Sequence, residues 1–371
     1  MIRGSLPSLR DGFLATIRRD SMRIALLHYS KPPVIGGVER VIDAQAAALA
    51  ALGHEVSLFD RGADARACFQ AWVKEACATR SAVIVHNVFT MPFDLAWTAE
   101  LLGLAETRRD ILWINWVHDA RWTEKVPQAV HVAVSEARRR EYAQAAGLPL
   151  EHIQVIPNGL DLDRVLGVTP KVAALGLQRR GLVLFHPTRL VRRKNIELGL
   201  RVTAALRAAG VDAAYLVTGA PDPHQADGLR YHEELRALRA ELGLEEAVIF
   251  VGDGEPCTEA DVRSLYALAD ALFFPSTGEG FGLPLLEALA FRLPVFCSDL
   301  PVHREVLGEN GHFFATEMSP GEISAQIMRW FSDNQSTSQR RHLLRTYDMV
   351  RICQESLEPL LVAANESAQH D

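Results

Sequence analysis

The chain is poor in cysteine. Its 371 residues include five cysteines, which is an odd number, and no two of them form a C-x-x-C pair. Disulfide frameworks depend on paired cysteines, and structural zinc sites depend on closely spaced ones, so the sequence favours neither. This usage fits the reducing cytoplasm, where we expect the protein to work.

Long hydrophobic runs are also missing. No apolar run approaches the roughly 18 residues that a membrane span requires. The first 21 residues contain only the short apolar patch GFLATI, which is too brief for a signal-peptide core of about 7–15 residues. We interpret residues 1–21 as an N-terminal extension, either an appended helix or a stretch upstream of a true start at Met22.

A general excess of positive charge is absent. The formal net charge is −7, whereas a general nucleic-acid binder shows a broad basic face, so we expect no nucleic-acid partner. Hydrophobic residues make up 48% and charged residues 23%, which is ordinary for globular proteins. At about 150 residues per domain, the length indicates two domains.

Strand-like and helix-like segments alternate from Met22 onward, which is typical of an α/β fold with parallel sheets. A linker is expected near residues 160–175. We therefore predict a first domain at 22–168, a second at 169–340 and a helical tail at 341–371 that could pack back on the first. Strands are predicted at 22–29, 55–60, 82–87, 111–118, 129–135 and 153–159, then at 181–190, 213–219, 247–253, 271–276 and 294–299.

The stretch STGEGFGLPLLEALA, Ser276 to Ala290, joins a glycine-rich turn to a helix. Such turns usually bind phosphate through bare backbone N–H groups, yet this one holds the acids Glu279 and Glu287. Eight residues of helix span about 12 Å, the length scale of a nucleotide-sugar from hexose to ribose. Two other interpretations are a dinucleotide fingerprint with Asp299 on a ribose, and a plain tight turn before Pro284.

This segment resembles the signature of retaining glycosyltransferases of the family-4 type, the glycosyl transferases group 1, and the resemblance extends from Met22 to the C-terminal helices. It implies the GT-B fold, in which two Rossmann-like doubly wound domains face each other across a cleft. The first domain would bind the acceptor and the second the donor. Glu279 would contact the donor sugar and Glu287 the ribose. The sugar and diphosphate would lie near Gly280, Phe281, Gly282 and Leu283.

The segment PTRLVRRKN follows a predicted strand of the second domain. By the resemblance, Arg189 and Lys194 hold the donor diphosphate, where fixed cations would stabilise the charge that develops on the leaving group. This chain has Thr188 where the family more often has glycine. A solvated basic loop is the alternative, because Arg192 and Arg193 enlarge the cluster.

Three further positions follow strand ends. Gly36 and Gly37 precede a helix N-terminus and resemble the family's glycine loop facing the donor phosphate, although any tight turn could use them. His118 resembles the histidine that contacts the donor sugar near the reacting carbon, although a core histidine is the plainer interpretation. Asp253, in FVGDGEP, would lie near the nucleobase by the same analogy.

Metal-ligating patterns are nearly absent. The D-x-D formed by Asp161 and Asp163 falls in the expected linker, so we interpret it as chance and predict no metal and no cofactor besides the donor substrate. The basic run at residues 138–140 is either a solvated helix face or a patch for anionic lipid. The second interpretation would suit peripheral contact with the inner face of a membrane.

Together these features predict a retaining, metal-independent hexosyltransferase. Its donor would be a UDP- or GDP-hexose and its acceptor a hydroxyl of a glycan, a lipid-linked molecule or a small molecule. A nucleotide-sugar epimerase, a phosphorylase and a non-catalytic nucleotide-sugar-binding module remain as alternatives. The base, the sugar, the acceptor, the linkage and the oligomeric state are not readable from the sequence.

Overall fold

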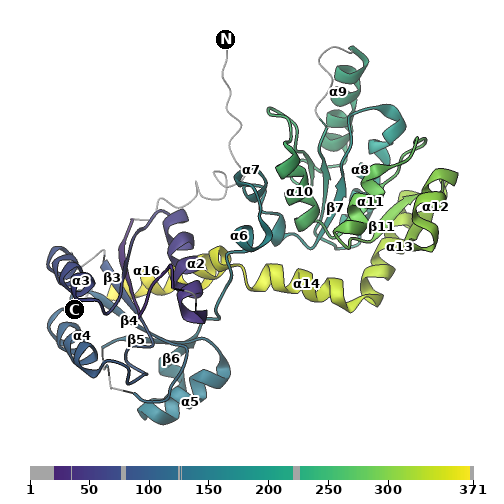
Figure 1. Ribbon diagram of the computed structural model, residues 1–371. Coiled ribbons are helices and arrows are strands. Elements are labelled where there is room, and N and C mark those ends of the chain that lie inside the picture. The colour runs from purple at the N-terminus through teal and green to yellow at the C-terminus, as the bar shows by residue number, and fades with distance from the viewer. Residues whose placement is uncertain are drawn as a thin grey trace. The chain divides into compact units, whose positions relative to one another are not determined.

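The computed structural model describes residues 21–34, 36–76, 81–123, 126, 128–219 and 226–367. The chain divides into two compact α/β units (Figure 1). Among the described residues, one unit, here called the N-terminal unit, holds the chain from Ser21 to Asp161 and again from Thr346; the other, the C-terminal unit, is Leu162–Arg345. Apart from Ser21, the predicted extension at 1–21 lies outside the described residues. The cleft expected between the two domains stays a prediction.

The N-terminal unit contains a six-stranded, all-parallel sheet in the order β2-β1-β3-β4-β5-β6. Its central strands are buried along almost their whole length, as expected for a parallel sheet covered by helices on both faces. The strands are β1 (Arg23–Leu27), β2 (Glu55–Phe59), β3 (Ser81–His86), β4 (Leu112–Val117), β5 (Val130–Ala133) and β6 (Ile153–Val155).

Alternate residues of these strands contribute to two separate hydrophobic cores. Ile24 and Leu26 pack on the face that α2 (Gly37–Ala51) covers. Ala25 and Leu27 pack on the opposite face against α3 (Ala63–Glu75) and α4 (Leu95–Thr107). A fourth helix, α5 (Glu136–Ala146), follows β5, and its N-cap Ser135 accepts a hydrogen bond from the backbone N–H of Arg138.

The C-terminal unit contains a second six-stranded parallel sheet, in the order β12-β11-β10-β7-β8-β9. This is the 3-2-1-4-5-6 order of dinucleotide-binding folds, with the switch point between β7 and β10, where ligands bind at the carboxyl ends of the strands. The strands are β7 (Leu182–His186), β8 (Ala213–Val217), β9 (Val248–Phe250), β10 (Ala271–Phe274), β11 (Val295–Ser298) and β12 (Gly311–Phe314).

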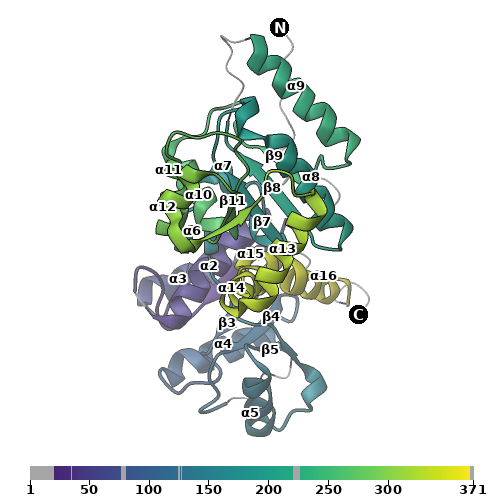
Figure 2. The same ribbon diagram turned by 90° about the vertical axis from the view of Figure 1, so that its right-hand side faces the viewer.

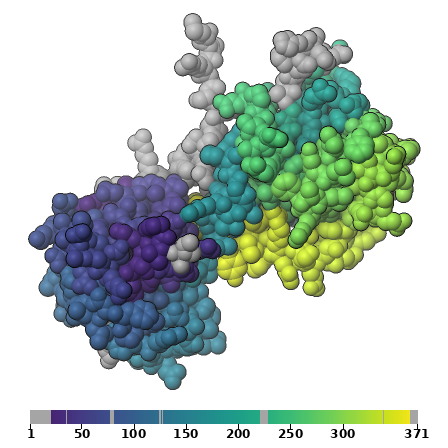
Figure 3. Space-filling model, in the orientation of Figure 1, coloured from purple at the N-terminus to yellow at the C-terminus, as the bar shows by residue number. Residues whose placement is uncertain are grey.

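Helices surround this second sheet. They are α6 (Leu162–Leu166), α7 (Pro170–Ala173), α8 (Ile196–Ala208), α9 (Ala226–Glu241), α10 (Glu259–Leu268), α11 (Leu283–Ala290), α12 (Pro301–Leu307), α13 (Pro320–Asp333) and α14 (Gln335–Thr346). Thr258 and Asp261 form a reciprocal capping box at the start of α10. In the space-filling view, α14 forms part of the unit's surface and is coloured yellow (Figure 3).

Every strand predicted from the sequence is present, and the α/β layout expected from the resemblance is confirmed. The strand missing from the prediction is β12. It has four residues, opens on Gly311 and pairs only with β11 at the sheet edge, so it lacks the apolar run that marked the others.

The first crossing between the units lies at Asp161/Leu162 rather than at 168/169. The reason is that the segment after Asp161 packs on the C-terminal unit. Leu166 and Val168 join its core, and the backbone N–H of Thr169 donates to Ser264 Oγ at 3.1 Å.

The second crossing lies at Arg345/Thr346 rather than at residue 341. Arg341 is buried and belongs to the C-terminal unit, because its guanidinium donates through Nε to Asp270 at 2.9 Å and through Nη1 to the Leu177 carbonyl at 3.1 Å. Asp270 precedes β10, so this ion pair attaches α14 to the second sheet. A buried carboxylate without such a partner would be costly.

After the second crossing the chain returns to the first sheet. The short α15 (Met349–Ile352), a π-helical turn (Cys353–Leu357) and α16 (Glu358–Ser367) follow. They bury Met349, Cys353 and Leu361 in the core that α2 covers, and α15 packs on α2 (Figure 2). The core of the N-terminal unit is therefore completed by residues 349–361.

The two crossing segments are tied to each other. Leu160 donates to the Tyr347 carbonyl at 2.8 Å and accepts from the Met349 N–H at 3.0 Å. Gly159 allows this approach, because a Cβ there would lie 2.8 Å from the Met349 Cα. Gly159 thus marks a close backbone contact between the two crossing segments.

Candidate active site

Arg189, Lys194 and Glu279, predicted for the site in the C-terminal unit, lie on two loops that follow the neighbouring strands β7 and β10. The backbone N–H of Thr277 donates to the Arg193 carbonyl at 2.7 Å, and Arg193 Nη1 donates to the Gly278 carbonyl at 2.9 Å. The loop bearing the acids is therefore fixed to the loop bearing the cations, at the switch point of the sheet.

Glu279 and Lys194 form a nearly buried ion pair, with side chains only 7% and 12% exposed. Arg193 Nη1 lies 3.2 Å from the other carboxylate oxygen. Burial alone would raise the pKa of Glu279, but the hydrogen bond and charge of Lys194, with help from Arg193, bring this pKa below its ordinary value. Glu279, predicted to contact the donor sugar, is thus ionised at neutral pH. It contacts Lys194, which is predicted to bind the diphosphate.

Arg189 lies on the same cation loop but behaves differently. Its side chain is exposed, and it makes no ion pair with any other residue in the described part of the chain. Its backbone packs against Gly219, where a Cβ would lie 2.7 Å from the Arg189 Cα. No local sequence pattern marks Gly219, because only the fold brings the end of β8 against this loop.

The turn before α11 needs glycine at one position. Gly282 has a φ of +89°, and a Cβ there would lie 2.9 Å from Leu285 Cδ1, while Gly280 has open space around it. Phe281 and Leu283, on either side of Gly282, are 52% and 62% exposed. The turn therefore presents both backbone and apolar side chains at the surface of the unit.

Glu287 lies exposed on α11 and is oriented by Tyr266, whose hydroxyl donates to Glu287 Oε2 at 2.7 Å. Tyr266 is buried, and its ring stacks on Phe291 with centroids 5.2 Å apart. Burial, followed by the hydrogen bond and charge of Glu287, raises the pKa of Tyr266, so its hydroxyl remains a donor. The sequence carried no signal for Tyr266, which lies on the preceding helix.

Asp253 follows β9, and its Oδ1 lies 3.1 Å from Nε2 of His232 on α9. Burial lowers the pKa of His232, while the charge of Asp253 opposes that change. Asp253 is therefore associated with a side chain from a neighbouring helix rather than directed only to solvent.

His303 is a further residue that the sequence analysis missed. It is buried on α12, donates through Nδ1 to the Ser298 carbonyl at 2.8 Å, and packs on Phe274 with ring centroids 5.5 Å apart. Lys194 Nζ lies 4.9 Å from the centre of the same Phe274 ring. Among the described residues, no hydrogen-bond partner reaches His303 Nε2. In the sequence, His303 could have been noticed because it lies in the segment PVHREV, which follows the predicted strand at 294–299.

In the N-terminal unit, the glycines predicted to face phosphate lie at the start of α2. A Cβ on Gly36 would overlap the Glu39 carboxylate, whereas Gly37 has open space. Glu39 is buried, accepts from the Ser30 hydroxyl, and lies 3.9 Å from His28 Nε2. The Glu39 carboxylate thus already lies near the positive N-terminal end of α2. Of the two glycines, Gly37 is the one with open space beside it.

His118 follows β4 and belongs to a row of buried polar side chains. Its Nε2 lies 3.0 Å from His86 Nδ1, and its Nδ1 lies 3.3 Å from Asn158 Nδ2. His86 Nε2 in turn lies 3.0 Å from Gln45 Oε1. Asn87 Oδ1 accepts from the backbone N–H of His118 at 2.8 Å, which fixes the strand end.

Burial determines the charge of these histidines. It lowers the pKa of His118 to about 3, with a smaller contribution from His28, and it lowers the pKa of His86 well below its ordinary value. Both rings are therefore neutral at neutral pH. A neutral ring of so low a pKa can orient a hydroxyl but is a poor general base.

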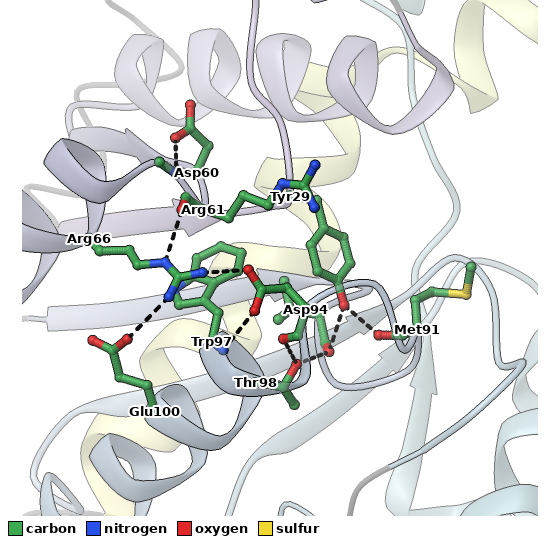
Figure 4. Close-up of polar contacts among 11 residues, drawn as sticks. Tyr29, Asp60, Arg61, Arg66, Met91, Asp94, Trp97, Thr98 and Glu100 are labelled. Atoms are coloured by element: carbon green, nitrogen blue, oxygen red, sulfur yellow. Dashed lines mark hydrogen bonds and ion pairs between the residues drawn. The ribbon is translucent and has the colours of Figure 1, made fainter.

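A second polar cluster lies at the carboxyl edge of the first sheet (Figure 4). Arg66 pairs with Asp94 at 2.5 Å and lies over the Trp97 ring, 5.5 Å from its centre. The Tyr29 hydroxyl donates to the Met91 carbonyl, and Phe93, 60% exposed, packs edge-on against the Tyr29 ring at 5.2 Å. This edge therefore presents an exposed aromatic ring on a rigid base.

The remaining sequence features place no further ligand. The described residues contain no group of three or more His, Cys, Asp or Glu side chains suited to a metal ion. Arg138 pairs with Glu141, and Arg139 with Glu136 at 2.9 Å, so two members of the basic run have local acidic partners. Within the described ranges, no helix combines the length and apolar character of a membrane span.

Residues 171–346 match the family model described as Glycosyl transferases group 1, which confirms the resemblance over those residues. The serotype-specific mannosyltransferase WbdA of Escherichia coli is 44% identical over 71 residues, covering 19% of this chain and 9% of that protein. The D-inositol 3-phosphate glycosyltransferase of Nocardia farcinica is 26% identical over 359 residues, covering 78% of this chain and 77% of that protein.

The chain spans less than a tenth of the length of the mannosyltransferases, which are the first of the curated relatives that it matches. Among solved structures, Anabaena Alr3699/HepE in complex with UDP and glucose is 21% identical, covering 91% of this chain and 99% of that chain. Its TM-score is 0.38.

The buried histidines predict how stability depends on pH. His118 and His186 have pKa values lowered to about 3, and His131 to about 4, chiefly by burial. In the unfolded chain they take up protons near pH 6.5, so below that pH the unfolded state binds more protons than the folded state. The free energy of unfolding should therefore fall as pH drops from about 6.5 toward 4.

Each such histidine contributes at most about 1.4 kcal/mol per pH unit to this slope. Urea unfolding followed by circular dichroism at several pH values would measure it. His186→Asn should remove one histidine's share while the asparagine retains a polar contact near the Tyr215 hydroxyl, now 2.6 Å from His186 Nδ1. An unchanged slope in this variant would show that His186 is not neutral in the folded state.

Proposed function

From the membership of residues 171–346 in the glycosyl transferases group 1, we propose that this chain is a retaining glycosyltransferase. It moves a hexose from a nucleotide-diphosphate sugar, such as a UDP- or GDP-hexose, to a hydroxyl of a glycan, a lipid-linked molecule or a small molecule. The donor binds the C-terminal unit at the carboxyl ends of β7 and β10.

The observation that carries this proposal is the juxtaposition of Glu279, Lys194 and Arg193 at the switch point. A carboxylate accepts hydrogen bonds from sugar hydroxyls, and the adjacent cations attract a diphosphate. A nucleotide-sugar offers both groups side by side. Glu287, held by Tyr266, provides the second acceptor for ribose hydroxyls.

Donor binding would redistribute the contacts of the ion pair. In the structure Lys194 neutralises Glu279, so an incoming diphosphate competes for the same ammonium group, and exposed Arg189 adds a bidentate contact. As the glycosidic bond breaks, negative charge grows on the diphosphate and these cations stabilise it. The backbone of Gly280, Phe281, Gly282 and Leu283 lies beside the sugar and diphosphate, and Asp253 lies near the base.

In the N-terminal unit, the open Gly37 side of α2 and the neutral ring of His118 contact the donor. Gly36 supports the turn beneath Glu39. The chain offers no clear enzymic nucleophile, which fits a front-face displacement in which the leaving phosphate helps to deprotonate the acceptor. Retention of the anomeric configuration follows from that geometry.

Incubation with a panel of nucleotide-sugars and acceptors tests the function. Transfer with the donor's anomeric configuration, read by NMR of the product, would support it. Isomerised donor without acceptor would indicate an epimerase, product formed from free phosphate would indicate a phosphorylase, and tight donor binding without turnover would indicate a binding module.

We expect the transferase to work without a divalent metal, because the cations at the site come from arginine and lysine. Exhaustive chelation should therefore leave the initial rate unchanged. Activity that disappears on chelation and returns with Mg²⁺ or Mn²⁺ would contradict this assignment and reopen a role for Asp161 and Asp163.

Substitutions of Glu279 and Glu287 should have different kinetic effects. Glu279→Gln should lower kcat by about 10²-fold, because small misplacement of the sugar is costly, while the released Lys194 still binds nucleoside diphosphate. Glu287→Gln should raise the donor KM with a modest change in kcat, since ribose contacts are equal in ground and transition states.

Calorimetry with the nucleoside diphosphate and initial rates would separate the two acids. Glu234→Gln is the matched control, because Glu234 is an exposed acid that pairs with Arg192 in the same unit. The reverse pattern, in which Glu279→Gln loses diphosphate affinity and Glu287→Gln retains it, would mean that the donor lies in the opposite direction along the loop.

The exposed ring of Phe93 is proposed to contact the acceptor, because it lies at the carboxyl edge of the first sheet with its base held by Tyr29. Phe93→Ala should raise the acceptor KM about five-fold, equivalent to ~1 kcal/mol of lost aromatic contact, and leave the donor KM unchanged. Leu150→Ala, which also removes an exposed apolar side chain of this unit, is the control. An unchanged acceptor KM in Phe93→Ala would exclude the contact.

A further inference from the structure

We propose that His86 and Gln45 are positioning residues that hold His118 as a neutral ring protonated on Nε2 and bare on Nδ1. The inference rests on the proposed function for the role of His118 in transfer. Its structural part stands on hydrogen-bond geometry alone, so the two can be tested separately.

With the side-chain amides of Gln45 and Asn158 oriented as in the structure, the chain of contacts has one consistent direction. Gln45 Oε1 can only accept, so His86 Nε2, 3.0 Å away, must donate. A neutral His86 then has a bare Nδ1, which accepts from His118 Nε2 at 3.0 Å. His118 Nδ1 is consequently bare and accepts from Asn158 Nδ2 at 3.3 Å. Each link has one donor and one acceptor.

Four separate parts of the N-terminal unit supply these side chains. Gln45 lies on α2, His86 ends β3, His118 follows β4, and Asn158 follows β6. Gln45 and His86 are completely buried. Such a row can reorganise only if buried polar groups lose their partners, which is costly.

Both ends of the row are anchored. Gln45 lies within α2, whose first turn carries the buried Glu39. Asn158 precedes Gly159, whose backbone packs directly on Met349 of the returning chain. The backbone beneath His118 is fixed as well, because Asn87, itself at a φ of +62°, accepts from the His118 and Asp119 N–H groups.

The surroundings favour neutral rings. His28 is the other titratable group that acts on both rings: its Nδ1 contacts the His86 carbonyl at 2.8 Å, and its Nε2 faces Glu39. Burial lowers the pKa of His28, His86 and His118 alike. A proton added to either member of the His86–His118 pair would place two N–H donors face to face or leave one unpaired.

This arrangement gives His118 a defined chemical role. The ring presents an acceptor at Nδ1, and the link from Asn158 is the longest in the row. A hydroxyl of the donor sugar can donate to that nitrogen in place of Asn158, while His86 retains the opposite side of the ring. His118 therefore orients the sugar as a neutral acceptor and does not serve as the base that removes the acceptor's proton.

Long-range ¹H–¹⁵N spectra of histidine-labelled protein test the assignment directly, because they distinguish protonated from bare ring nitrogens. His118 should show a protonated Nε2 and a bare Nδ1 throughout the neutral range. A single tautomer protonated on Nδ1, a doubly protonated ring, or an even mixture of the two tautomers would each overturn the proposal.

The near-isosteric variants His86→Leu and His86→Asn test the positioning. Leucine removes the acceptor for His118 Nε2, whereas asparagine retains one near the position of Nδ1. In His86→Leu, His118 should populate both tautomers and kcat should fall about 10²-fold with unchanged diphosphate affinity. His86→Asn should restore one tautomer and part of kcat. Equal kcat in both variants would overturn the role of His86.

His131→Asn is the matched control, since His131 is a buried histidine of the same sheet that contacts Tyr142 and Asn115 instead. It should leave the His118 tautomer unchanged. Should His86→Leu fail to fold, Gln45→Met removes the far partner without touching His118 and should also mix the tautomers; a single Nε2-protonated tautomer there would overturn the role of Gln45.

Failure of the proposed function gives a different pattern. If no nucleotide-sugar is turned over by the wild-type chain, transfer is excluded, yet the wild-type and variant spectra still decide the tautomer. If transfer is observed but the spectra show mixed tautomers, the proposed function survives and this inference does not.

Discussion

A carboxylate that is almost buried needs a cation beside it, and the pair formed by Glu279 and Lys194 meets that requirement in the C-terminal unit. The pair exists because two neighbouring parallel strands deliver their following loops to one edge of the sheet. It keeps Glu279 ionised and holds Lys194 at the switch point. The geometry of the two loops, and with it the proposed donor site, depends on this contact.

The N-terminal unit treats its buried polar groups in another way. Its histidines lie among strands that are apolar on both faces, where a charge without a partner would be expensive. They remain neutral and form hydrogen bonds with one another and with side-chain amides, as in the row from Gln45 to Asn158. One unit thus offers charges to a ligand, whereas the other offers oriented neutral donors and acceptors.

The C-terminal part of the chain contributes to the packing of both units. Arg341 attaches α14 to the second sheet through Asp270, and a few residues later Met349 and Leu361 complete the core of the first. The crossing segments pair at Leu160, two residues after Asn158, whose side chain contacts His118. A substitution at Met349 or Leu361 would therefore disturb the core of the N-terminal unit and, through Gly159, the position of Asn158 at the end of the histidine row.

The sequence by itself determined the α/β class, the strands except β12, and the acids and cations of the candidate site. These features are local: apolar runs, glycine turns and capping residues carry their meaning within a few positions. The two acids and the arginine-lysine loop could be identified because their residue types and spacing suit one ligand.

Only the tertiary structure decided which of these side chains meet. Lys194 contacts Glu279, Tyr266 orients Glu287, and His86 contacts His118 across 85, 21 and 32 residues of sequence, respectively. Gly219 and Gly159 matter through backbone approaches that no local pattern encodes. The division between the units likewise follows the packing of Leu166 and Arg341. Strand order and burial set these pairings, and neither is a property of any short segment.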